Sequence, residues 1–293
     1  MRIIAISSLG SYHRFVLEQL HQRFPLTAVI QPRGLSKTTP VSRTDKFRKG
    51  LRHPLQFVET RLQRWHNARQ LRKFEEALEN ALFPCSGESS GTLFDSITQT
   101  IERDQLNSVR CQELMERLEP DLIITSGCPL LRPGIFETPR LGTLNVHWGI
   151  APAYRGEDTL FWPLYFGDFT QLGGTIHQID QSIDRGPLLS QYWPELNHTD
   201  TEETITRKTA YGLGRQIVTV VEQIAQQNAI HGIVPEAKGR MFSRKLKTWR
   251  HDVVYALRRK AGQLKPSSLA EREYFAVSRE NRAARPRHER VTV

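Results

Sequence analysis

The stretch Ile3-Ile-Ala-Ile-Ser-Ser-Leu-Gly10 is a short apolar run that ends in a loop of small residues. Such a run is typical of a buried central strand. Apolar residues then repeat at helical spacing between Tyr12 and Phe24, and Leu26–Ile30 forms a second apolar run. A strand, a helix and a strand at this spacing predict a βαβ unit, and therefore a doubly wound α/β sheet. The first loop lacks the GxGxxG pattern and holds only Gly10, so it does not support a dinucleotide site.

Further elements continue this pattern along the chain. Helices are expected at Asn107–Leu118 and Thr201–Gln227, and strands at Asp121–Gly127, Leu141–Val146 and Gly173–Ile179. These elements predict one α/β catalytic domain over residues 1–238.

Residues 33–91 depart from the pattern of the surrounding domain. This stretch is basic, is broken early by prolines and has helical spacing from Leu62 to Leu82. We interpret it as a long insertion that is part loop and part helix. Gly87–Gly91 is the expected linker back to the core.

The segment from 239 to 293 is interpreted as a basic C-terminal extension. The core pattern stops beyond Gly239, and apolar residues between Phe242 and Leu257 recur at helical spacing among Arg and Lys. The segment after Lys265 is expected to be disordered. On this interpretation, removal of the residues after Gly239 would leave catalysis intact.

The composition limits the kind of partner. The chain has 293 residues, of which 38% are hydrophobic, so it can bury a core. The formal net charge of +10 lies mostly in Arg33–Lys73 and Lys238–Arg290. A basic excess suits an anionic partner: nucleic acid, a phosphorylated substrate, an acidic cofactor or a membrane surface. A solvated face is the simpler explanation of such charge runs.

Cysteine spacing and the start of the chain bear on the compartment. Cys85, Cys111 and Cys128 are widely spaced, which indicates neither a zinc knuckle nor a disulfide framework. The first apolar run is too short for a signal peptide or a membrane span. We therefore expect a soluble cytoplasmic protein with no transmembrane segment.

Three polar residues stand where ligands bind in such sheets. Asn145 and His147 lie at the carboxyl end of an expected strand, and residues two apart on a strand face the same side. Asp184 follows the next strand in a polar loop, so it reaches the same edge if the two strands are neighbours. Arg155 and Gly156 belong to a constrained loop after His147.

An amide, an imidazole and a carboxylate together suit acyl transfer to an amine. Asn145 can donate to a developing oxyanion, and His147 can act there as well or shuttle protons. Asp184 can orient or charge the imidazole and accept the proton of the amine. No serine or cysteine nucleophile and no metal are required.

Three stretches carry a more specific resemblance: Asp121–Gly127, Leu141–Gly156 and Gly174–Pro187. Together they resemble the folate-dependent formyltransferase family, which includes methionyl-tRNA formyltransferase and sugar N-formyltransferases. The hallmark of that family is Asn-x-His followed by an Asp and, shortly after, a Gly. Here Asn145, His147, Asp184 and Gly186 match it. The resemblance implies a Rossmann-like, mainly parallel sheet and catalysis by Asn145, His147 and Asp184.

The resemblance also implies a co-substrate and the residues around it. The co-substrate would be 10-formyltetrahydrofolate, with its pteridine beside two loops. The implied binding residues are Ser126, Gly127, Cys128, Leu130, Leu131 and Asp180. The acceptor side is expected to involve Trp148, Arg155, Gly156 and His177. For three of these a structural role is the alternative: packing for Trp148, fixing the loop for Arg155, and a core position for His177.

The expected acceptor is a primary amine, first of all an amino sugar, either free or linked to a nucleotide. Family members that act on tRNA carry a small β-barrel after the catalytic domain, and no such pattern follows Gln227. In the family's usual Ser-Leu-Leu-Pro stretch only Pro152 is kept, because Gly149, Ile150 and Ala151 replace the other residues. That departure concerns substrate geometry more than chemistry.

Other hypotheses remain open. Water could replace the amine, which would give a formyltetrahydrofolate hydrolase, and a methionyl-tRNA formyltransferase-like activity is a further alternative. A metal hydrolase has no compact ligand motif in its favour. A non-enzymatic protein could act through its basic segments on RNA or on a membrane surface.

Overall fold

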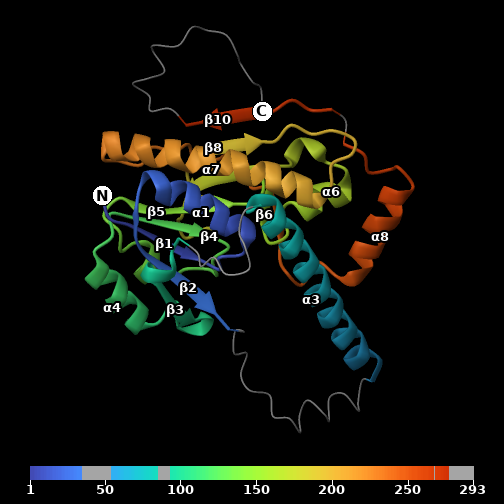
Figure 1. The fold of residues 1–293 in the computed structure, drawn as a ribbon, viewed down its shortest axis with the longest axis horizontal. Coiled ribbons are helices and arrows are strands. Elements are labelled where there is room, and N and C mark those ends of the chain that lie inside the picture. The colour runs from blue at the N-terminus through green and yellow to red at the C-terminus, as the bar shows by residue number, and fades with distance from the viewer. Residues whose placement is uncertain (35–53, 85–92, 267, 277–293) are drawn as a thin grey trace.

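An eight-stranded sheet forms the centre of the molecule (Figure 1). A computed structural model describes residues 1–34, 54–84, 93–266 and 268–276. The strand order of the sheet is β10-β8-β7-β5-β4-β1-β2-β3. The strands are β1 (Ile3–Ser7), β2 (Leu26–Arg33), β3 (Thr98–Glu102), β4 (Leu122–Ser126), β5 (Gly142–His147), β7 (Gly174–Gln178), β8 (Leu188–Trp193) and β10 (Arg272–Phe275). A second sheet pairs β6 (Tyr154–Gly156) with β9 (Arg240–Phe242). The five neighbouring strands β3, β2, β1, β4 and β5 run parallel to one another. From β5 onward, each of β7, β8 and β10 pairs antiparallel with the strand before it in the sheet. This arrangement confirms the predicted mainly parallel α/β sheet.

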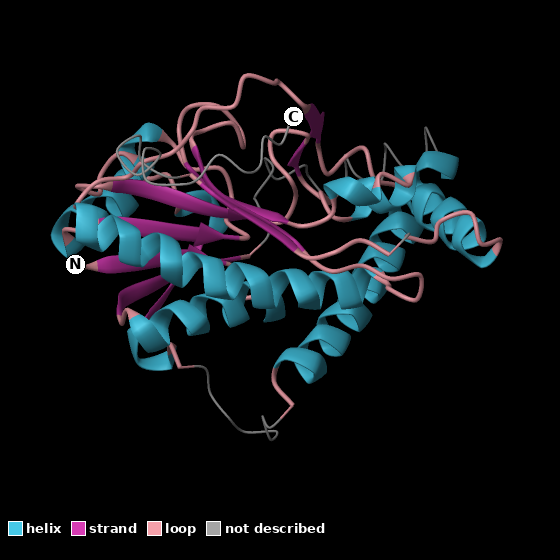
Figure 2. Ribbon diagram, turned by 90° about the horizontal axis from the view of Figure 1, so that it is seen from above, coloured by secondary structure: helices cyan, strands magenta, loops and turns pink. Residues whose placement is uncertain are grey.

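The alternation of side chains along the strands divides the core into two layers. In β1, Ile3 and Ala5 face one side and Ile4 and Ile6 face the other, and each set belongs to a different apolar cluster. Helices cover both faces (Figure 2). The helices are α1 (Ser11–Arg23), α3 (Pro54–Leu82), α4 (Val109–Leu118), α5 (Pro133–Phe136), α6 (Phe161–Phe166), α7 (Glu202–Gln227) and α8 (Trp249–Lys260).

Local signals explain where the long helices begin and end. Thr201 and Thr204 form a capping box at the start of α7, and Asn228 ends that helix in the left-handed region. Ser108 caps α4 by accepting from the Cys111 N–H, and Glu119 ends it just before Pro120. The predicted helices at Asn107–Leu118 and Thr201–Gln227 are therefore confirmed to within about two residues.

The helix α3 lies inside the expected insertion, begins earlier than predicted and packs against the domain. Leu78 and Leu82 are buried in the same cluster as α1 and α7, and Phe74 packs against it. This end of α3 therefore belongs to the core of the α/β domain. The expected linker at Gly87–Gly91 lies outside the described residues.

Residues 268–276 are more ordered than the sequence predicted, and residues 277–293 of the same expected tail lie outside the described residues. Disorder was expected after Lys265, yet β10 pairs antiparallel with β8, and the Ala276 N–H donates to the Leu189 carbonyl at 2.7 Å. The sequence gives little sign of this because a four-residue edge strand among charges has no clear apolar periodicity.

The core also continues past Gly239, where the pattern was expected to stop. Phe242 in β9 is 8% exposed and stacks on Tyr154 and Trp162, with ring centroids 5.5 and 5.0 Å apart. Within the described ranges, no helix has the length and apolar character needed to cross a membrane.

Candidate active site

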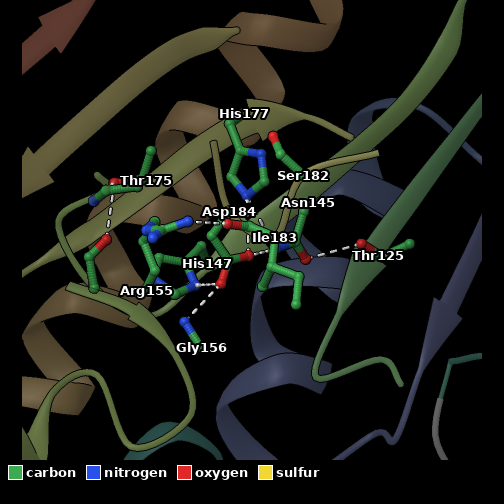
Figure 3. Close-up of polar contacts among 12 residues, drawn as sticks. Thr125, Asn145, His147, Arg155, Gly156, Thr175, His177, Ser182, Ile183 and Asp184 are labelled. Atoms are coloured by element: carbon green, nitrogen blue, oxygen red, sulfur yellow. Dashed lines mark hydrogen bonds and ion pairs between the residues drawn. The ribbon is translucent and has the colours of Figure 1, made fainter. Parts of the chain in front are cut away.

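The site lies at the carboxyl end of β5, as Figure 3 shows. Because β5 pairs directly with β7, Asn145 lies opposite His177 in the register. The loop after β7 then brings Asp184 back to the same edge, with its Oδ1 3.4 Å from Asn145 Nδ2 and its Oδ2 3.7 Å from His147 Nδ1. The structure thus brings together the three residues predicted to carry the chemistry.

The Asn145 amide is held in one orientation. Its Oδ1 accepts a hydrogen bond from Thr125 Oγ1 at 2.8 Å, so its Nδ2 points to the opposite side. There Nδ2 donates to His177 Nε2 at 3.2 Å and to Asp184 Oδ1 at 3.4 Å. The contact with Asp184 is the longer of the two, and a substrate oxygen can replace it. Asn145 is therefore a preset donor at the edge of the sheet.

His147 is buried and has a defined tautomer. Its Nε2 lies 2.9 Å from the Tyr154 carbonyl oxygen, which can only accept, so Nε2 carries a proton. In the neutral ring, Nδ1 then keeps its lone pair and faces Asp184. Burial lowers the pKa of the His147 imidazole, and the Asp184 carboxylate opposes this only in part. At neutral pH the ring can therefore accept a proton at Nδ1.

Asp184 is the charged member of the cluster. Burial alone would raise the pKa of its carboxyl, but attraction to a protonated His147 ring, contact with the His177 ring and the hydrogen bond from the Gly156 N–H hold that pKa below its usual range. The Gly156 N–H donates to Oδ2 at 2.8 Å. Asp184 itself has a φ of 50°, a strained backbone conformation that aims its side chain back at the sheet.

The loop around Gly156 explains why a glycine stands there. Gly156 has a φ of 92°, and a Cβ at this position would collide with the Phe242 carbonyl oxygen in the paired strand β9. The neighbouring Arg155 donates from its guanidinium to the Ile183 carbonyl at 3.0 Å. Arg155 therefore fixes the loop that carries Asp184. Fixing a loop was one of the two roles expected for Arg155.

His177 and Trp148 are enclosed by the protein. His177 is 2% exposed, donates from Nδ1 to the Gln178 carbonyl at 3.0 Å and accepts from Asn145. The Trp148 ring is 9% exposed and packs edge-on against Tyr12 with centroids 4.4 Å apart. The Trp148 side chain thus packs against Tyr12 and His13 of α1.

The residues expected around the co-substrate fall into two groups. Ser126 is fully buried and hydrogen bonds with His13, whereas Gly127 and Leu130 are exposed. Asn107 ties the exposed loop by donating to the Leu130 carbonyl at 2.9 Å and accepting from the Arg132 N–H.

The remaining members of this expected set have local roles. Leu131 packs partly against the apolar cluster under α4, and burial raises the pKa of the Cys128 thiol, which keeps it protonated. Asp180 is exposed and accepts from the Ser182 N–H and hydroxyl in a local turn. These loops therefore offer mainly backbone groups to a ligand.

Thr125, the residue that sets the orientation of the Asn145 amide, was not predicted from the sequence. Thr125 is 1% exposed and lies directly opposite Asn145 in the register of β4 and β5. A hydroxyl in an otherwise apolar strand was the available signal, but β-branched residues are common in strands and the signal is weak.

The fold and the cluster define a class: an α/β protein with a preset amide donor, a neutral imidazole and an ionised carboxylate at the ligand-binding edge of its sheet. Comparison with known families matches residues 72–221, about half of the chain, to the formyl transferase family. The chain belongs to this family.

Individual relatives match shorter parts of the sequence. The bifunctional polymyxin resistance protein ArnA of Wigglesworthia glossinidia brevipalpis is 33% identical over 36% of this chain and 16% of its own length. Methionyl-tRNA formyltransferase of Kosmotoga olearia is 36% identical over 36% of this chain and 34% of its own length. The matched region thus spans about a third or less of these relatives. A sugar N-formyltransferase from Shewanella sp FDAARGOS_354 shares the fold, with a TM-score of 0.54, 12% identity and coverage of 88% of this chain and 87% of its own.

Proposed function

We propose that this protein transfers a formyl group from 10-formyltetrahydrofolate to a primary amine. The observation that carries the proposal is the contact of one carboxylate, Asp184, with both Asn145 and His147 at the edge of the sheet. Membership of the formyl transferase family supports the group that is transferred. The choice of an amine as the acceptor and of a folate as the formyl donor is part of the proposal.

Each of the three residues has a distinct role in this reaction. Asn145 donates from Nδ2 to the oxygen on which negative charge develops. His147 takes a proton from the attacking amine at Nδ1, since Nε2 is committed to the Tyr154 carbonyl. Asp184 then stabilises the imidazolium from 3.7 Å, while the Gly156 N–H keeps the carboxylate in place. His177 positions the Asn145 amide by accepting from it.

The loops on the other side of Asn145 fit a planar, partly apolar ligand. Leu130 is 67% exposed on a loop that Asn107 holds at Leu130 and Arg132, and Asp180 already accepts hydrogen bonds from Ser182. The pteridine would therefore be held by backbone groups of Gly127–Leu131 and of the Asp180–Asp184 loop. When bound, 10-formyltetrahydrofolate supplies the formyl carbon.

A small amine, first of all an amino sugar, is the proposed acceptor. The structural neighbour described as a sugar N-formyltransferase spans nearly the same length as this chain. After α7, the described residues contain the helix α8 and two short strands, the three-residue β9 and the four-residue β10, which form no β-barrel. A methionyl-tRNA acceptor is the second candidate, because the sequence relative that carries that name is 36% identical in the matched region. Localisation in the cytoplasm also remains part of the proposal.

The test is a turnover assay with purified protein, 10-formyltetrahydrofolate and a panel of amines, with mass spectrometry of the product. Asn145→Ala and His147→Ala should each lower kcat by about 100-fold or more. His198→Ala is the matched control, because His198 is an exposed surface histidine. Wild-type rates for both catalytic variants would refute the assignment. Release of formate without any amine would instead identify a hydrolase.

A further inference from the structure

The start of α1 lies at the edge of the sheet, immediately after β1. In doubly wound sheets a helix start at this place commonly binds phosphate, because its free N–H groups point outward and the helix dipole favours an anion. Here α1 has no acidic residue in its first turn, and Gly10 provides no side-chain cap. The first N–H groups of α1 therefore have no acceptor within the first turn of the helix.

Glu75 of α3 provides that acceptor. Ser11 donates to Glu75 Oε2 twice, from its backbone N at 2.9 Å and from its hydroxyl at 2.8 Å. The other carboxylate oxygen lies beside Gly10, since a Cβ built on Gly10 would be 3.0 Å from Oε1. An anion that belongs to the chain thus occupies the position at the helix start that a phosphate would take.

Contacts on both sides of Glu75 hold α3 in this position. One turn further along α1, Arg14 forms an ion pair with Glu79 at 2.6 Å. Leu78 is 1% exposed in the core, and Phe74 packs edge-on against Tyr12 with centroids 6.2 Å apart. Moving the Glu75 carboxylate away would therefore require α3 to leave the core or its side chain to leave two hydrogen bonds.

Side chains also fill the space beside the ends of the paired strands β1 and β4. His13 Nδ1 lies 2.8 Å from Ser126 Oγ, and its ring packs edge-on against Trp148 with centroids 5.5 Å apart. The same ring lies so close to Gly127 that a Cβ there would collide with it. Trp148 directly follows His147 in the chain, so the backbone connects this filled region to the catalytic cluster.

We propose that Glu75 is a specificity-determining residue. Its carboxylate occupies the anion position of α1, so the enzyme takes an amine acceptor that carries no phosphate at this position. A nucleotide-linked acceptor must place its phosphates elsewhere. The statement about acceptors rests on the proposed function, whereas the occupied helix start does not.

Phosphate binding at Ser11 tests the proposal directly, with inorganic phosphate as the probe. Glu75→Ala and Glu75→Ser remove the carboxylate, and Glu76→Ala is the matched control because the Glu76 side chain is 64% exposed beside Arg72. In protein labelled with ¹⁵N-serine, phosphate should leave the Ser11 amide resonance unmoved in the wild type and in Glu76→Ala. It should shift that resonance in either Glu75 variant. At about ten times the dissociation constant, phosphate should also raise Tm by roughly 3 °C over chloride of equal ionic strength.

Movement of the Ser11 resonance in the wild type, or none in a folded Glu75 variant, would overturn the proposal. An activity measurement extends the test: for any amine that is formylated, the wild type should prefer the unphosphorylated form over the phosphorylated one. Glu75→Ala should narrow that preference at least about fivefold, and an unchanged preference would also count against Glu75. If no amine is formylated, the proposed function fails, and the Ser11 resonance still decides the role of Glu75.

Discussion

Substitution of Thr125 by Val removes one hydroxyl group from beneath the site and keeps the shape of the side chain. The hydroxyl donates to Asn145 Oδ1 at 2.8 Å and has one proton, with the Leu144 carbonyl at 3.1 Å as a second acceptor. This bond decides which end of the Asn145 amide faces Asp184. Valine packs in the same space but cannot hold the amide oxygen.

The expected magnitude follows from the partners that remain. A buried amide oxygen without a donor costs about 1–3 kcal/mol in the free energy of unfolding. The amide keeps part of its preference, because His177 and Asp184 still accept from Nδ2 and a flipped amide would place its oxygen near the Asp184 carboxylate. We therefore expect a loss of about 1 kcal/mol of transition-state stabilisation, which lowers kcat about fivefold.

Thr125→Ser is the matched control, because it keeps the hydroxyl and loses only a methyl group. Steady-state formyl transfer should be about fivefold slower for Thr125→Val than for Thr125→Ser, and urea unfolding should show the lower stability of the valine variant. The reasoning is refuted if Thr125→Val turns over at the wild-type rate. It is equally refuted if both variants are slowed to the same extent.

Three other perturbations have defined outcomes. Gly156→Ala should lower the free energy of unfolding by at least about 2 kcal/mol and abolish turnover, because Gly156 has a φ of 92° and the new Cβ would collide with the Phe242 carbonyl oxygen. Circular dichroism melting measures the loss of stability, and the turnover assay measures the loss of activity. Phe242→Ala should cost about 3 kcal/mol in urea unfolding, whereas the exposed Val253→Ala should cost less than about 0.5 kcal/mol. Burial lowers the pKa of His13 to about 3, so the unfolded chain takes up that proton first and stability falls as the pH drops from 6.5 toward 3. Between pH 7 and pH 5 this loss is about 2 kcal/mol, and His13→Asn should remove it from denaturant titrations.

The position of the site could be predicted because short periodicities determine it. Asn145 and His147 share a strand face by alternation, and the next strand in the chain pairs directly with theirs. The return of Asp184 to that edge then required only that the two strands be neighbours. The roles of Arg155 and Trp148 could not be predicted in this way, because the residue type does not show whether a side chain turns toward the ligand or toward the protein.

Other features depend on contacts between distant parts of the chain, and no local pattern encodes them. Glu75 lies far along the chain from Ser11, and its role appears only when α3 packs on α1. The edge strands β3 and β10 are short and polar, so their pairing partners stabilise them more than their own sequence does. The prediction that removal of the residues after Gly239 would leave catalysis intact did not take β9 into account. β9 pairs with β6, and Gly156 of β6 donates a hydrogen bond to Asp184.

The position of the Asp184 carboxylate depends on residues that lie far from it in the sequence. β9 pairs with β6 so that Arg155 lies opposite Met241 and Gly156 opposite Phe242. This register fixes the position of the Gly156 N–H, which donates a hydrogen bond to the Asp184 carboxylate. α3, in contrast, meets the start of α1 through Glu75 and meets α8 through His66, which lies 3.1 Å from Asp252. The two segments therefore separate two properties of the enzyme: changes in β9 should alter the rate of formyl transfer to every acceptor, whereas changes at Glu75 should alter which acceptors are used.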